Sequence, residues 1–369
     1  MFSGSTIWRF SKDVASLKQL AAHNFEDILQ LWLPVLYARI QRALTQEIDT
    51  QVQRVLFSPT HWHALAKLFL HTLATLKHLA NKTGKLGKQL RKFQAATAAF
   101  EVYKTPYNAV PQMTRIRDIG DALDVIQRRL DKQVNSSPSD NNQANQGNSA
   151  EPYTIGQTSR TENAINIPLW VRSHGSNPVT KHLLLRITGN LSSTKIGKVL
   201  FQTDRMFSHG TFGINYTSYD VRREHDTINP KSPSRFILLP GNTINDPNAH
   251  PFLYARVLGI YHANVRYCGR PPKRMDFIWV RWLDYDEKEP GGRELERLDR
   301  VSYAPCRNDE ELLDGFGFID PRNIMRAAHL IPDFDSGTSG SIFAANSTLA
   351  APDDSEHDWN YHYVNRFVD

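Results

Sequence analysis

The sequence predicts an α+β protein made of an N-terminal helical segment, a disordered linker and a C-terminal, small β-barrel-like domain with one short helix. Three observations lead to this fold class. Apolar residues recur at helical spacing before residue 135, residues 135–151 carry almost no apolar side chain, and apolar and polar residues alternate from Phe212 onward. The 369-residue chain therefore divides into a helical segment 1–134, a linker 135–151, a weakly structured connecting segment 152–211 and the β domain 212–369.

Within the helical segment, the stretch "SPTHW" has the features of a helix start. Ser58 or Thr60 would cap the helix, and Pro59 would occupy its first turn, where the missing amide hydrogen costs nothing. The forty residues that follow are expected to form one long helix or two, with a break at Gly84 and Gly87. Further helices are expected at 11–55 and 119–132.

The β domain contains one unusual strand, "RMDFIWVRWLDYD", at 274–286. Its alternation places Trp279 and Trp282 on opposite faces, and neither face is purely polar, which is typical of a central strand with both sides covered. Two interpretations stay open: both tryptophans belong to the core, or one of them lines an aromatic groove that binds a peptide or a methylated lysine by cation–π contact. One short helix is expected in this domain, capped by Asp320 with Pro321 in its first position.

The charge of the chain is unevenly distributed. The net charge is +6, but residues 1–134 hold 19 Lys and Arg against 10 Asp and Glu, whereas residues 212–369 hold 18 against 24. A basic first part favours a polyanionic partner. The acidic last part argues against a nucleic-acid footprint over the whole surface.

The basic charges are densest in one helical stretch, which is the candidate DNA-binding site. A helix face of this kind would neutralise phosphates of duplex DNA without reading the sequence, although a solvated helix face without a ligand stays an alternative. The candidate residues are Lys77, Lys82, Lys85, Lys88, Arg91 and Lys92.

No catalytic residue, metal site or cofactor is expected. The acidic cluster Asp220, Glu224 and Asp226 alternates with bases, which favours surface ion pairs over a metal centre. The residues His63 and His71 share a helical spacing, but Lys67 lies between them and would repel a cation, so this set is interpreted as a polar face. We also find no phosphate-binding glycine loop and no arrangement typical of nucleophilic catalysis.

Cellular location is indicated only by absences in the sequence. The chain has two cysteines, Cys268 and Cys306, too few for a disulfide framework, and it has no apolar run long enough to span a membrane and no signal peptide. Nuclear or cytoplasmic residence is expected, with the nucleus favoured. Neither a membrane nor a small-molecule substrate is expected as a partner.

Several blocks of the sequence resemble a known family. The C-terminal blocks are "FGINYTSYDVRREHDTINP", "NAHPFLYARVLGIYHANV", "MDFIWVRWLDY", "GFGFIDPRNIMRAAHLIPDF" and "DWNYHYVNRFVD", and the N-terminal ones are "LAAHNFEDILQLWLPV", "HWHALAKLFLHTLATL" and "LGKQLRKFQ". They resemble the C-terminal region of Plavaka-type, CACTA-like transposase proteins of mushroom-forming fungi, in the same order. The strand layout also resembles a bromo-adjacent-homology barrel, which is an analogy of pattern only.

The resemblance implies a truncated part of a transposase. Members of the family are longer, their zinc-finger and catalytic segments precede the matched part, and a further family stretch is replaced here by the linker 135–151. The resemblance therefore implies a non-catalytic accessory module that binds duplex DNA, a transposase or a chromatin protein. Two alternatives remain: a degenerate relic without a selected function, and part of an active DNA transposase.

Overall fold

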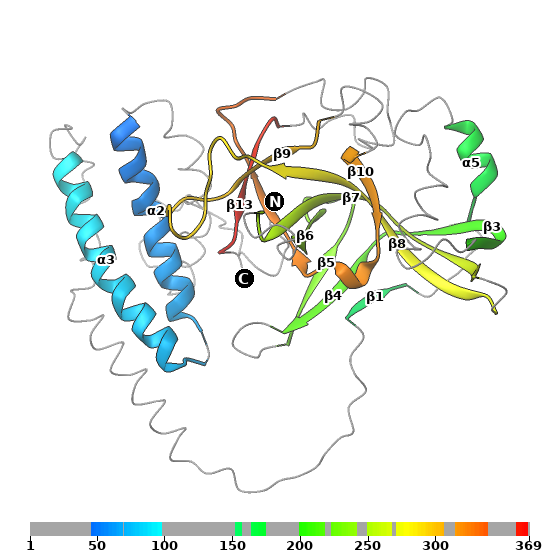
Figure 1. Ribbon diagram of the computed structural model, residues 1–369, viewed down its shortest axis with the longest axis horizontal. Coiled ribbons are helices and arrows are strands. Elements are labelled where there is room, and N and C mark those ends of the chain that lie inside the picture. The colour runs from blue at the N-terminus through cyan, green and yellow to red at the C-terminus, as the bar shows by residue number, and fades with distance from the viewer. Residues whose placement is uncertain are drawn as a thin grey trace, which may run out of the picture.

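The computed structural model places a pair of helices beside a strand-rich part (Figure 1). Helices together with extensive antiparallel sheet confirm the α+β class. The helix expected at 119–132, the linker 135–151 and residues 11–45 of the stretch 11–55 lie outside the described residues, whereas 46–55 are helical as expected. The structure describes residues 46–68, 70–97, 152–156, 164–174, 199–217, 223–241, 249–267, 271–305, 314–338 and 359–367.

The two long helices form an antiparallel hairpin. Helix α2 spans Gln46–Ala66 and α3 spans Leu73–Thr97. Leu79 of α3 is completely buried, and the indole Nε1 of Trp62 donates a 2.8 Å hydrogen bond to Thr83 Oγ1 across the pair. An apolar stripe on each helix therefore stabilises the hairpin, as expected for helices with one buried face.

The expected helix boundaries were wrong at two places. Pro59 and its neighbours lie inside α2, not at its start, and α3 continues through Gly84 and Gly87. The break falls instead after Ala66. Glycine costs a helix only about 1 kcal/mol, and tertiary packing readily compensates for a single helical proline or glycine, so neither residue had to end a helix here.

The main sheet is antiparallel and strongly curled. Its hydrogen-bonded order is β11-β6-β7-β8-β9-β13-β12, with β10 pairing β8 and β3 pairing both β7 and β2. The order begins and ends on neighbouring strands of the chain, because only Ala328 separates β11 from β12. Among the described residues the ladder does not close into a barrel, yet both of its ends lie on one continuous stretch of chain. The strands are β2 (Ala164–Asn166), β3 (Val199–His209), β6 (Phe236–Pro240), β7 (Phe252–Tyr267), β8 (Lys273–Tyr285), β9 (Arg300–Tyr303), β10 (Phe316–Ile319), β11 (Arg326–Ala327), β12 (His329–Pro332) and β13 (His362–Asn365).

A second, smaller sheet and a short helix complete the β part. The small sheet has the order β1-β4-β5, with β1 at Tyr153–Ile155, β4 at Phe212–Thr217 and β5 at Arg223–Ile228. Helix α5, Ile167–Ser173, follows β2 directly. The segment 152–211 therefore supplies β1, β2, α5 and β3 to the β part, in contrast to the weakly structured connection expected from its irregular pattern.

The short helix expected after Asp320 is a single 3-10 turn, η4, at Pro321–Asn323. The cap itself was correct, since the Asp320 side chain accepts a hydrogen bond from the Arg322 amide at 2.9 Å. The residues after the turn form two short strands at the two ends of the curled sheet: β11 pairs with β6, and β12 pairs with β13. Strand pairing has overridden the local helical preference.

The helical hairpin docks on the β part through an apolar cluster. Phe57 of α2 is 4% exposed and belongs to a core cluster with Leu298, Ile331 and Tyr363. The Phe57 ring also meets the Phe367 ring edge to face, with ring centres 5.1 Å apart. The orientation of α3 is therefore fixed relative to the sheets. No helix in the described part of the chain is both long and apolar enough to cross a membrane.

Candidate nucleic-acid interface

Helix α3 begins with a turn in which the hydroxyl of each of two threonines accepts a hydrogen bond from the backbone amide of the other. The Thr75 amide donates to Thr72 Oγ1 at 3.2 Å, and the Thr72 amide donates to Thr75 Oγ1 at 2.8 Å. This is a capping box with threonine in place of the usual glutamate. The buried Leu79 and Leu86 then set which face of the helix is turned away from solvent.

On the opposite face of α3 every charged side chain is a base. The 25-residue helix contains no Asp or Glu. At 100° per residue its five exposed bases fall within roughly 120° of arc. These residues, defined here as the basic face, are Lys77, Lys85, Lys88, Arg91 and Lys92.

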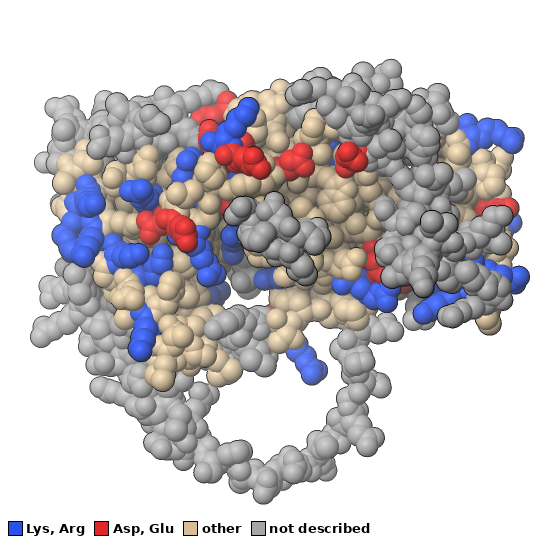
Figure 2. Space-filling model, viewed as in Figure 1, with Lys and Arg blue, Asp and Glu red and all other residues tan. Residues whose placement is uncertain are grey.

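The basic face has dimensions that suit a nucleic-acid backbone. From Lys77 to Lys92 the helix rises by about 22 Å at 1.5 Å per residue. Duplex DNA offers one phosphate per ~3.4 Å of each strand, so several phosphates lie within reach of such a face. Figure 2 shows Lys and Arg side chains gathered over the helical hairpin, with a few acidic side chains among them.

Lys82 does not belong to the basic face, contrary to the sequence expectation. Its side chain is only 12% exposed, and its Nζ lies 3.7 Å from Glu296 Oε1. Gln89, two helical turns further and on the same side, donates to the other oxygen of Glu296. Lys82 therefore fixes α3 to the loop between β8 and β9, and it is not available to a phosphate on the outer face.

Two histidines lie at the junction of the hairpin with the β part. His61 of α2 is 4% exposed, and its ring centre lies 5.7 Å from that of the exposed His78 on α3. Burial, together with the charges of Lys82, Arg293 and His78, lowers the pKa of His61 to about 4. Partial burial and then Lys82, Arg293 and Lys85 lower the pKa of His78. Both shifts favour the neutral form of the ring.

The histidine set considered from the sequence does not assemble, and Asp220 of the acidic cluster lies outside the described residues. His63 lies in α2, but Lys67 and His71 follow the end of that helix, so the three do not share a helix face. Asp226 accepts a 2.9 Å hydrogen bond from the Ala327 amide and pairs with Arg326, which agrees with a structural role. The described residues contain no group of three or more His, Cys, Asp or Glu able to hold a metal ion.

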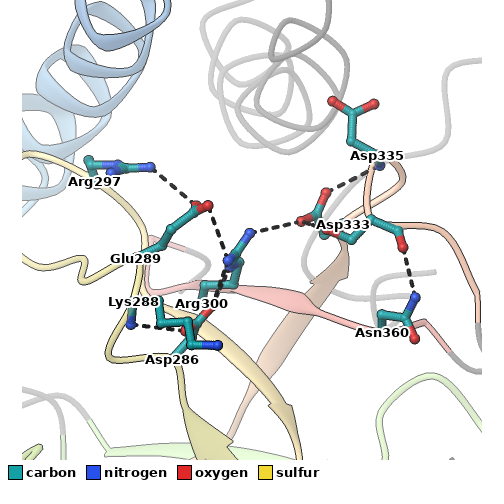
Figure 3. A network of polar contacts seen from close by, with 9 residues as sticks. Asp286, Lys288, Glu289, Arg297, Arg300, Asp333, Asp335 and Asn360 are labelled. Carbon is teal, nitrogen blue, oxygen red and sulfur yellow. Dashed lines mark hydrogen bonds and ion pairs between the residues drawn. The ribbon is translucent and has the colours of Figure 1, made fainter. Parts of the chain in front are cut away.

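The densest set of carboxylates surrounds a single arginine (Figure 3). Arg300 contacts Asp286 at 2.6 Å, Glu289 at 3.1 Å and Asp333 at 3.5 Å. Its guanidinium also lies 4.3 Å above the Tyr361 ring. Asp333 is completely buried. Because the guanidinium occupies the centre of this set, the network joins the ends of β8, β9 and β12 and leaves no room for a cation.

The two tryptophans proposed for an aromatic groove lie on opposite faces of β8 and differ in burial. Trp279 is 3% exposed and stacks on Phe318 with ring centres 6.2 Å apart. Trp282 is half-buried and packs against the core cluster on the other face of β8. Burial therefore excludes Trp279 from a surface groove, whereas a groove at Trp282 stays a prediction. The core interpretation holds for Trp279, and the expected covering of both faces of this strand is confirmed.

Glu296 and Arg293 were missed by sequence reasoning, because their role arises from tertiary contact. They lie in the hairpin Gly292–Arg297, closed by backbone hydrogen bonds of 2.8 and 3.3 Å between its end residues. In sequence this stretch is only part of an acidic, glycine-containing loop. Two positive φ angles, at Gly292 (115°) and Glu296 (56°), shape the turn.

Comparison with known proteins adds no assignment: no family model matches the chain, and neither the curated proteins nor the solved structures contain a match.

Proposed function

We propose that this chain is a non-catalytic accessory module of a transposon-derived protein, and that the basic face of α3 binds the phosphates of duplex DNA without reading its sequence. The observation that supports this proposal is the coincidence of five exposed cations on one face of a helix without any acid. Such a surface has a strong positive potential and attracts a polyanion from a distance. A nuclear location follows from this proposal.

The test is a salt series on the full chain with a random-sequence duplex. If five phosphates are contacted, the logarithm of affinity should fall with the logarithm of salt with a slope of about −4.5, at 0.9 per contact. Replacing Lys77, Lys85, Lys88, Arg91 and Lys92 together by Gln should abolish measurable binding at physiological salt. An unchanged slope in this variant would refute the proposal.

The matched control removes the same amount of charge from another part of the surface. Lys231, Lys273, Lys288, Arg205 and Arg223 are exposed residues of the β part. Their replacement by Gln lowers the net charge equally, so it should weaken DNA binding only slightly. Equal loss of binding in both variants would show that net charge alone, and not the basic face, drives the association.

A further inference from the structure

The structure holds a buried imidazole without a hydrogen-bond partner at the hairpin junction. The His61 ring lies against the rings of Phe57, His78 and Phe367, with ring centres 5.7, 5.7 and 6.2 Å away. Neither of its two ring nitrogens forms a hydrogen bond to any described residue. Buried polar groups almost always have a partner, so this imidazole indicates a ligand group that the described residues do not supply.

The charges around this imidazole decide what kind of ligand fits. The ionisable groups that act on His61 are Lys82, Arg293 and His78, which are all bases. Glu296 already accepts from Lys82 and Gln89, and the same hairpin holds Glu294 together with Arg293 and Arg297. Bases exceed acids at this junction, so a metal cation is disfavoured and an anion is favoured.

We propose that the junction of α2, α3 and the hairpin Gly292–Arg297 binds a phosphate group. His61 and His78 would donate hydrogen bonds to its oxygens, while Lys82 and Arg293 supply the positive charge. An ammonium carries three donors, so Lys82 can keep its contact with Glu296 while it donates to the phosphate. None of these four residues belongs to the basic face, although Lys85 of that face adds positive charge near His78, and the proposal stands whether or not the basic face binds DNA.

The first experiment measures the thermal midpoint of the full chain in inorganic phosphate and in sodium chloride of equal ionic strength. A ligand that binds only the native state raises the midpoint, by about 2 °C or more at ten times its dissociation constant. We expect this rise in the wild type and its loss in His61→Phe and His78→Gln. His78 is exposed, so His78→Gln keeps the fold even if His61→Phe does not.

Lys88→Gln is the control, because Lys88 is exposed on the basic face and outside the junction. It should keep the full rise in phosphate. Equal midpoints of the wild type in phosphate and chloride would overturn the proposal. A rise that persists in both histidine variants would overturn it as well, since the phosphate would then bind elsewhere.

A second arm identifies the source of the phosphate group. If the junction holds a backbone phosphate of DNA, His78→Gln should lower duplex affinity at every salt concentration, with little change in slope because the substitution removes a hydrogen bond and no charge. If it holds inorganic phosphate or a phosphorylated small molecule, duplex affinity and slope stay unchanged while the thermal rise is lost. A variant of the basic face that replaces Lys77, Lys88, Arg91 and Lys92 but keeps Lys85, which acts on His78, should keep the thermal rise in both cases, which separates failure of this proposal from failure of DNA binding.

Discussion

His362 shows at the residue scale how burial controls protonation. It is 5% exposed and lies near the rings of Phe236 and Tyr303, each with its centre 5.8 Å away. Burial, followed by the charges of Arg256 and Arg235, lowers its pKa to about 3. In the unfolded chain a histidine titrates near its ordinary value of ~6.5, so below that pH only the unfolded state gains a proton.

The folded protein should therefore lose stability in acid. The titration of His362 does not change the free energy of unfolding above pH ~6.5. Below that pH it lowers the free energy of unfolding, by about 2 kcal/mol at pH 5. His362→Leu should remove that part of the acid loss. The measurement is urea unfolding of both proteins at pH 7 and pH 5. An equal loss of unfolding free energy in the variant and the wild type would contradict this assignment.

Arg300 joins the ends of three strands of the main sheet, β8, β9 and β12. Arg300→Lys should destabilise the protein by about 2–4 kcal/mol, because a lysine cannot reach three carboxylates and stack on Tyr361 at once. Denaturant unfolding at neutral pH measures this loss. Arg322→Lys is the control, since Arg322 also pairs with an aspartate but its side chain is 69% exposed. The control should cost less than about 1 kcal/mol, and similar losses in both variants would argue against a special role for Arg300.

At the element scale, α3 contains a glycine that the helix does not need. A Cβ at Gly84 would meet no atom within 4 Å. Gly84→Ala should stabilise the protein by about 0.5–1 kcal/mol, because alanine loses less backbone entropy in a helix. Thermal unfolding of the two proteins tests this. Gly317→Ala should do the opposite, since its Cβ would lie 2.8 Å from Trp282 Nε1, and a stabilised Gly317→Ala would contradict the packing described.

Elements with a strong residue pattern were predicted correctly, and their ends were not. The alternation around Trp279 correctly indicated a central strand covered on both faces, because the period of two is a direct consequence of strand geometry. Pro59 and Gly84 misled the helix boundaries, because their local cost is smaller than the packing free energy of a docked hairpin. The turn after Asp320 has the cap of a helix but the pairing of a strand.

The candidate site was predicted in composition but not in orientation. The sequence identified all five residues of the basic face from charge density alone. It could not show that Lys82 faces Glu296, because the two residues are more than two hundred positions apart and meet only in the tertiary fold. For the same reason the sequence could not show that His61 and Arg293 lie near each other, because their proximity depends on how the hairpin docks.

At the scale of the whole molecule, the hairpin and the β part should unfold as one unit. Phe57→Ala should cost about 3–5 kcal/mol, as expected for truncating a buried phenylalanine. It should also separate the single transition into two, because Phe57 lies in the docking contact. Calorimetry tests both points, with Leu169→Ala as control, since Leu169 is 60% exposed. A single, unshifted transition in Phe57→Ala would show that docking does not depend on this contact.

The position of β13 has a consequence for how the protein is made. This strand, the last of the described strands in the chain, lies between β9 and β12 and pairs with both (Figure 1). A growing polypeptide cannot complete the sheet until residue 365 has left the ribosome. Until then β9 and β12 each present an unpaired edge, the type of surface that recruits other chains. Nascent copies are therefore exposed to aggregation until this last strand is in place.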